Sequence, residues 1–174
     1  MTLRWLLMLP LLWVATTASA LDLGPVSLSA HGVVGHNVSQ GTYYGLGVDL
    51  AAHLDDHLSL GVGGYYTAGE HPSLDREMGA GPFVSYSYQI LEFLVASARE
   101  EVDYLDEHNP YTNASGTLDY HSEHGVASIT SLALGLFLTR NFGVSAGYRF
   151  AFGLNNSDLA KDHSGFFFGL AFGI

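Results

Sequence analysis

The sequence predicts an all-β protein, an eight-stranded antiparallel up-and-down β-barrel that crosses a membrane. Three observations predict this fold. Eight segments alternate oily residues with small or polar ones, the connections between them alternate between short and long, and the N-terminus has the pattern of an export signal. The alternation has a period of two, which is that of a β-strand, because successive side chains of a strand point to opposite faces.

Residues 1–20 have the pattern of a cleaved secretory signal peptide. Arg4 supplies a positive charge, 5–14 is an almost continuous apolar run, and 18–20 is a small-residue cleavage site. The apolar run is shorter than the ~20 residues that a transmembrane helix requires. We therefore predict a signal peptide over 1–20 and a barrel over 21–174.

The alternation delimits eight strands, an even number, as bacterial single-chain barrels have. The last strand shows it best, because Phe166, Phe168 and Leu170 lie on one face while Gly165 and Gly169 lie on the other. Oily groups facing lipid and small groups facing a filled interior explain this pattern. A soluble β-sandwich or lipocalin-like barrel would have to bury the oily face and expose the glycines. The predicted strands are 26–35, 42–54, 58–68, 78–90, 93–105, 124–138, 142–154 and 164–174.

The connections between these strands alternate in length without exception. The short ones are 55–57, 91–92 and 139–141. The long and polar ones are 39–41 with its neighbours, 69–77, 106–123 and 155–163. Outer-membrane barrels have this asymmetry, with short turns on the periplasmic side and longer loops outside the cell. The loop 106–123 is therefore predicted to be external.

Composition excludes several classes of function. The chain has no cysteine, which excludes disulfides and thiolate chemistry. Charged residues make up only 13% and the formal net charge is −11, so a nucleic-acid partner is not expected, because binding phosphates requires a basic surface.

The segment Gly147-Tyr148-Arg149-Phe150 resembles a motif that is common in strands of the small eight-stranded outer-membrane barrels. In architecture the whole predicted barrel resembles this class, which includes the OmpA membrane domain and the OmpX/Ail group. The resemblance implies a location in the outer membrane of a Gram-negative bacterium, contact with outer-membrane lipid and lipopolysaccharide, and insertion by the barrel assembly machinery. Members usually end in Phe, whereas this chain ends in Ile174.

An eight-stranded barrel has an interior just wide enough for side chains to fill, so we predict no open pore. Counting residues along the strands places Asp49, Arg99 and Arg149 near mid-height. Buried arginines need carboxylate partners, which predicts a lumen ion-pair network of Asp49, Arg99, Glu101 and Arg149, with Asp103 as an alternative carboxylate. The facing of the fifth strand stays open, because Arg99 and Glu100 cannot both point into the lumen.

The residues do not favour an enzymatic function. The PagL-type lipid A deacylases resemble this chain in length and topology and carry a catalytic His-x-Ser in the penultimate strand, where His activates Ser. The matching position here is Phe150-Ala151-Phe152, so we predict a non-enzymatic protein with no catalytic residue and no cofactor. A hydrolase that uses His121-Ser122 or His163-Ser164 is the alternative.

The predicted external loops are rich in histidine beside carboxylates. His121, Glu123 and His124, together with His71 or His108, have the side chains that bind Zn²⁺, but their spacing is irregular. A divalent-metal site is therefore an alternative to ordinary solvated loops. Loops on a rigid scaffold are where binding usually occurs. We predict a structural or surface-interaction role, with 106–123 as the main contact surface and an unknown external ligand.

Overall fold

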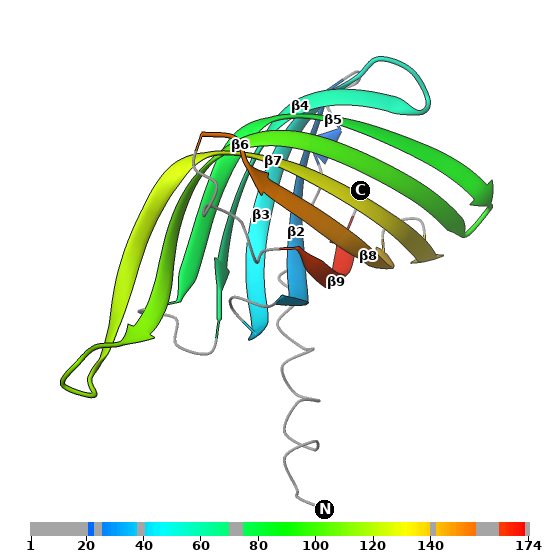
Figure 1. The fold of residues 1–174 in the computed structure, drawn as a ribbon. Coiled ribbons are helices and arrows are strands. Elements are labelled where there is room, and N and C mark those ends of the chain that lie inside the picture. The colour runs from blue at the N-terminus through cyan, green and yellow to red at the C-terminus, as the bar shows by residue number, and fades with distance from the viewer. Residues whose placement is uncertain are drawn as a thin grey trace, which may run out of the picture.

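The protein folds as a closed antiparallel β-barrel without helices in the described part of the chain (Figure 1). The computed structural model describes residues 21–22, 26–37, 41–69, 75–139, 142–155 and 164–172. Among these residues no helix is long and apolar enough to cross a membrane. The strands are β1 (Leu21–Asp22), β2 (Val26–Asn37), β3 (Gly41–His53), β4 (Leu58–Ala68), β5 (Arg76–Leu91), β6 (Leu94–Thr112), β7 (Leu118–Thr139), β8 (Phe142–Gly153) and β9 (Gly165–Phe172).

Eight strands form the barrel. Each strand from β2 to β9 pairs with its neighbours in sequence, and pairing of β2 with β9 closes the ring. The two-residue β1 pairs with Ser27 and Leu28 of β2, which precede the part of β2 that pairs with β9. The prediction of an eight-stranded up-and-down barrel is confirmed. The predicted signal peptide, 1–20, lies outside the described residues.

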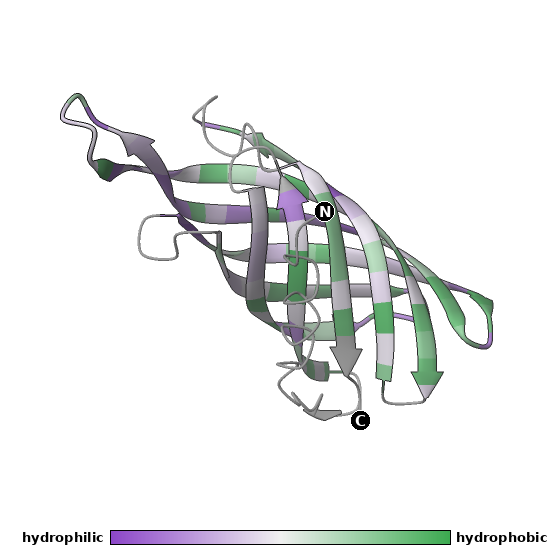
Figure 2. Cartoon of the chain, turned by 90° about the horizontal axis from the view of Figure 1, so that it is seen from below, coloured by the Kyte–Doolittle hydropathy of each residue, from purple (hydrophilic) through white to green (hydrophobic). Residues whose placement is uncertain are grey.

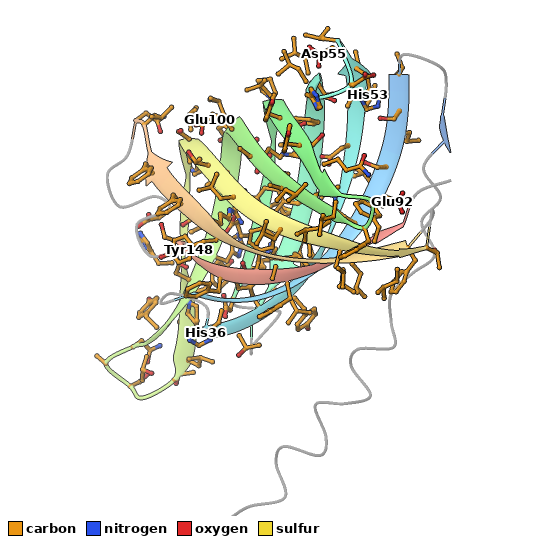
Figure 3. All side chains as sticks on the ribbon, turned by 90° about the vertical axis from the view of Figure 1, so that its right-hand side faces the viewer. His36, His53, Asp55, Glu92, Glu100 and Tyr148 are labelled. Carbon is orange, nitrogen blue, oxygen red and sulfur yellow. The ribbon has the colours of Figure 1, made fainter. Side chains whose placement is uncertain are left out.

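The barrel has two different ends. The turn end carries the tight connection 54–57 and the turn at 92–93, and the loop end carries the remaining described connections. Figure 3 shows His53 and Asp55 at the turn end and His36 at the opposite end. Asp55 Oδ1 accepts hydrogen bonds from the backbone N–H groups of His57 (2.7 Å) and Leu58 (2.8 Å). These bonds stabilise the ionised carboxylate and lower the pKa of Asp55.

Oily side chains lie on the outside of the barrel. On β3, Leu46 and Val48 are 54% and 57% exposed, whereas the inward Asp49 is only 9% exposed and Ala51 is buried. The alternating colours along the strands in Figure 2 show the same pattern on the wall as a whole. A soluble barrel would have the opposite polarity, because its apolar groups would face inward. The outer surface is that of a barrel whose solvent is lipid.

The predicted loop 106–123 is wrong in its extent. β6 continues to Thr112 and β7 begins at Leu118, so most of this segment is a two-stranded ribbon that projects beyond the other strands (Figure 1). Its tip is a turn in which Asn113 Oδ1 accepts from the backbone N–H groups of Ser115 (3.1 Å) and Thr117 (3.0 Å). Gly116 adopts a φ of 79°, which favours glycine. The alternation is invisible in the sequence because both faces of the ribbon are polar.

A closed barrel of this kind should resist unfolding by detergent. We expect the purified protein to migrate faster on a dodecyl sulfate gel when unheated than when boiled, with β-rich circular dichroism in the unheated sample. The reason is that all eight strands are paired on both sides for most of their length, so no edge opens until the ring breaks. Recovery as a soluble protein in the absence of detergent would contradict the transmembrane reading.

Candidate functional site

The centre of the lumen holds an ion-pair cluster from two strands, β3 and β6. The guanidinium of Arg99 on β6 forms two hydrogen bonds with the Asp49 carboxylate on β3, at 2.7 and 3.0 Å. It also donates to Glu101 Oε2 from Nη2 (2.7 Å) and from Nε (3.0 Å). This arrangement gives Arg99 a carboxylate on each side. The Arg99 guanidinium also lies over the Phe83 ring, whose centroid is 3.7 Å from the Arg99 Cζ.

The local sequence explains how the cluster fits. Arg99 and Glu101 are two residues apart on one strand, so both point inward. The neighbouring strand β4 has glycine at 61 and 63, and a Cβ at Gly63, which pairs with Asp49 in the register, would collide with the Asp49 carboxylate and with Arg99 Nη2. The small residues of β4 therefore provide the space that the charged side chains of β3 and β6 occupy.

A second cluster surrounds Arg149 of β8. Its Nη2 donates to Glu77 Oε1 (3.1 Å) and to the Tyr65 hydroxyl, which in turn donates to Glu77. The Tyr65 ring centroid lies 4.8 Å from the Arg149 Cζ. The Glu77 side chain is buried. Arg149 and Glu77 therefore form a charge pair that is separate from the Asp49–Arg99–Glu101 cluster.

The structure brings together three of the four residues predicted for the lumen network. Asp49, Arg99 and Glu101 are joined, whereas Arg149 pairs with Glu77. Asp103 is buried and faces the lumen, but no ion pair to it occurs among the described residues, and its Oδ1 has no hydrogen-bond partner there. Glu77 was missed because it was assigned to a loop. Extending the alternation of Gly79, Gly81 and Phe83 back by one step would have placed it in the lumen.

Beside these clusters the lumen is hollow. A cavity of about 680 Å³ is lined by the two arginines and by serines 29, 85, 87, 97, 131 and 145. Serine hydroxyls can satisfy one another or bind water, so this space needs no further charged residue. The cavity also touches Tyr43 and Thr67, near the loop ends of β3 and β4, so the two charge clusters line it and do not close it off.

His53 contributes an interaction that was not predicted. Its Nδ1 lies 2.8 Å from Ser59 Oγ and its Nε2 lies 2.9 Å from Ser27 Oγ. Because both ring nitrogens are engaged by hydroxyls of the flanking strands, the imidazole ties β2, β3 and β4 together at the turn end. The alternation along β3 could have predicted that His53 faces inward, but it could not have predicted that Ser27 and Ser59 are its hydrogen-bond partners.

The histidines proposed as metal ligands are spread along the β6–β7 ribbon. His121 Nε2 lies 3.4 Å from Glu123 Oε1, and the His108 ring stacks on Tyr120 with centroids 4.7 Å apart. His124 is opposite Asp106 in the register. No group of three His, Asp or Glu side chains able to hold a metal occurs within the described residues. His71 lies outside them.

Comparison with known proteins identifies the fold. No protein-family model matches the chain, and no curated protein matches it. Among solved structures, the N-terminal β-barrel domain of Pseudomonas aeruginosa OprF matches with a TM-score of 0.58 and 12% identity, covering 84% of this chain and 93% of that one. Neisserial surface protein A matches with a TM-score of 0.59 and 14% identity, covering 86% of this chain and 97% of that one. The chain has the fold of the small eight-stranded outer-membrane β-barrels.

At such identities the likeness concerns the fold alone. A de novo designed transmembrane β-barrel also matches, with a TM-score of 0.50 and 14% identity, over 83% of this chain and 92% of that one. A fold that is shared with a designed chain does not specify an activity. Function must therefore be argued from the side chains that this barrel displays.

The lumen clusters predict unequal effects of mutation. We expect Arg99→Met to lower the free energy of unfolding by about 3–5 kcal/mol, because it leaves two buried carboxylates without their cation. Asp49→Asn should cost less, since Arg99 keeps Glu101. In double-mutant cycles measured by reversible unfolding in detergent, Arg99 and Asp49 should be coupled, whereas Arg149 and Asp49 should be additive within about 0.5 kcal/mol. Strong coupling of Arg149 to Asp49 would contradict two separate clusters.

Two adjacent glycines of β4 provide a matched test of the packing. We expect Gly63→Ala to lower the free energy of unfolding by about 1–3 kcal/mol, because the new methyl group would press on the Arg99–Asp49 pair. Gly64→Ala should be nearly neutral, because its Cβ would point outward and meet only ordinary contacts at 3.6 and 3.7 Å. The same unfolding assay measures both. Equal effects would show that the lumen is not tightly packed at this level.

Proposed function

We propose that the protein is a non-enzymatic barrel of the outer membrane of a Gram-negative bacterium, which holds the β6–β7 ribbon outside the cell as a surface for contact with an external partner. The observation that carries this proposal is the ribbon itself. Beyond His108, β6 pairs only with β7 in the described part of the chain, so residues 109–121 add nothing to closure of the barrel. Figure 2 shows the projecting end as mainly hydrophilic.

The ribbon offers two kinds of contact. Its faces carry exposed aromatic and charged side chains, among them Tyr111 and Tyr120. Its β7 edge offers backbone groups. The backbone groups of Val126 point to the side of β8, because the Val126 carbonyl accepts a hydrogen bond from Leu154 N (2.7 Å). Backbone groups alternate in direction along a strand, so the N–H and C=O groups of His124 and Ser122 point to the same side as those of Val126. Within the described residues, no strand pairs with that side of 118–126. Such an edge can bind an extended peptide.

The location has its own support. The natural proteins among the matching solved structures are outer-membrane barrels, and most outward side chains between the two ends of this barrel are apolar. Lipid and lipopolysaccharide would then surround the wall, and the barrel assembly machinery would insert it. The orientation, with the ribbon outside, follows the rule that short turns are periplasmic and long connections are external.

Photo-crosslinking on intact cells tests the contact surface. A photoreactive amino acid in place of Tyr120 should give a discrete crosslinked product with an external partner, because this position lies on the ribbon. The matched control replaces Tyr88, an exposed tyrosine near the turn end, and should not give that product. The same product from both positions, or none from the ribbon, would argue against this role.

The non-enzymatic part of the proposal has a separate test. Expression in a host of defined lipid A should leave the mass spectrum of the lipid unchanged, because the penultimate strand has Phe150 and Phe152 where a His-x-Ser pair would lie. Loss of an acyl chain would refute this part of the proposal. Ser122→Ala and Ser164→Ala would then show whether either candidate serine is responsible.

A further inference from the structure

Glu100 of β6 places a carboxylate on the outer wall of the barrel. Because Arg99 and Glu101 point into the lumen, Glu100 points outward between the alanine at 98 and Val102. Figure 3 marks Glu100 on the barrel wall. A charged side chain that faces lipid destabilises a barrel and is a candidate functional group by default. This feature lies apart from the ribbon, so the inference goes beyond the proposed function.

Two hydroxyls of β7 hold the Glu100 carboxylate in place. Ser128 Oγ donates to Glu100 Oε1 (2.6 Å), and Thr130 Oγ1 donates to Glu100 Oε2. Thr130 is directly opposite Glu100 in the register, and Ser128 is opposite the next outward residue, Val102. An ionised carboxylate has about four lone-pair positions, and these bonds occupy one on each oxygen. The half-buried group therefore keeps acceptor capacity toward the lipid.

A groove begins beside this polar trio, on the side of the turn end. It has a volume of about 640 Å³ and a floor of alanines and leucines from β6, β7 and β8. Tyr86 and Tyr88 form one wall, and Tyr148 and Phe166 form the other. The two tyrosine-bearing strands β5 and β8 are three strand spacings apart, which makes the groove about 14 Å wide. Ala98 and Leu132, which line the groove, form one outward-facing cross-strand pair, and Glu100 and Thr130 form the next such pair toward the loop end. The polar trio therefore lies at the border of the groove nearest the loop end.

The position of Glu100 along its strand selects the kind of donor. Tyr104 and Asp106 follow on the same outward face, four and six residues nearer the loop end. At about 2.5 Å of height per residue of a tilted strand, Glu100 lies roughly 10 Å below the tyrosine, near the middle of an apolar band of about 25 Å. A headgroup at the membrane surface would not reach this depth. The hydrogen-bond donor must be carried on an alkyl chain within the hydrocarbon layer. A hydroxyl group suits this position, because it is a small donor and little polar surface has to be buried in lipid.

We infer that Glu100, Ser128 and Thr130 form a binding site for a membrane amphiphile whose alkyl chain carries a hydroxyl group. The hydroxyl donates to the Glu100 carboxylate, and the chain continues along the groove toward the turn end. A lipid whose headgroup lies at the loop end of the barrel has its alkyl chains pointing in this direction. A second copy of the barrel is a poorer occupant, because a symmetric contact at this face would bring two Glu100 carboxylates together.

The test uses the full chain, folded in nanodiscs of a saturated phosphatidylcholine. The nanodiscs also contain equal trace amounts of two probe lipids, one with a mid-chain hydroxyl on an acyl chain and one without it. Native mass spectrometry then counts the lipids that stay on the barrel. We expect retention of the hydroxylated probe to exceed that of the plain probe by about tenfold, as a hydrogen bond to a charged acceptor provides. Equal retention of the two probes would overturn the inference.

Variants separate the polar trio from the groove. Glu100→Leu should reduce the ratio of the two probes to about one while the unheated protein still migrates as a folded barrel, because this change removes a charge from the lipid face. Ala98→Phe should reduce retention of both probes by filling the groove floor. Ala80→Phe, an outward alanine away from the groove, is its matched control and should change neither. A preference that survives Glu100→Leu, or a two-barrel species that this change abolishes, would refute the lipid site.

Discussion

Closure of the hydrogen-bonded ring is the constraint on which the rest of this structure depends. A strand edge in lipid has no water to satisfy its N–H and C=O groups, so a sheet survives there only when its first and last strands pair. Here that pairing is β2 with β9, from His31 with Ala171 to Asn37 with Gly165. Once the ring is closed, the outward residues contact lipid and the inward residues must fill a narrow space. The two faces of every strand therefore obey different rules.

The inward rule explains why glycine and arginine occur together in the lumen. At the level of the charge clusters the interior of the barrel is narrow, so each large group lies beside a small one. Gly63 makes room for Arg99 and Asp49, and Gly79 makes room for the Tyr65 ring that contacts Arg149. The arginines in turn neutralise carboxylates that could not otherwise be buried. Packing and charge pairing in the lumen are thus two aspects of one fit, and neither cluster could be replaced one residue at a time without leaving a void or a charge.

The sequence predicted the wall well because lipid imposes a period of two wherever it touches the barrel. It predicted Asp49 in the lumen for the same reason, because the residues around Asp49 on β3 alternate clearly. On β6 the alternation left open whether Arg99 or Glu100 points inward, and the structure places Arg99 in the lumen. It could not show that Arg149 chooses Glu77, because partner choice depends on the register between strands far apart in the chain. The ribbon has no periodic signal in the sequence because water contacts both of its faces, so the sequence predicts a loop there. The hairpin is instead closed by Asn113 and Gly116, a local signal that hydrophobic patterning does not contain.

Two features of the described chain are not required by closure, and function is best sought in such features. The β6–β7 ribbon extends past the last pairing with β5 and β8, where it contributes backbone edges rather than removing them. Glu100 places a carboxylate on an outer face where the flanking outward positions of β6 carry alanine and valine. A chain under selection for stability alone would have a short turn in place of the ribbon and an apolar residue in place of Glu100. The ribbon exposes unpaired backbone groups to water, and Glu100 exposes a polar group to lipid, and both lower stability. The barrel accommodates both without disturbing the lumen, since one lies beyond the ring and the other lies on its outer face. The scaffold is therefore compatible with an external contact and a lipid contact at the same time.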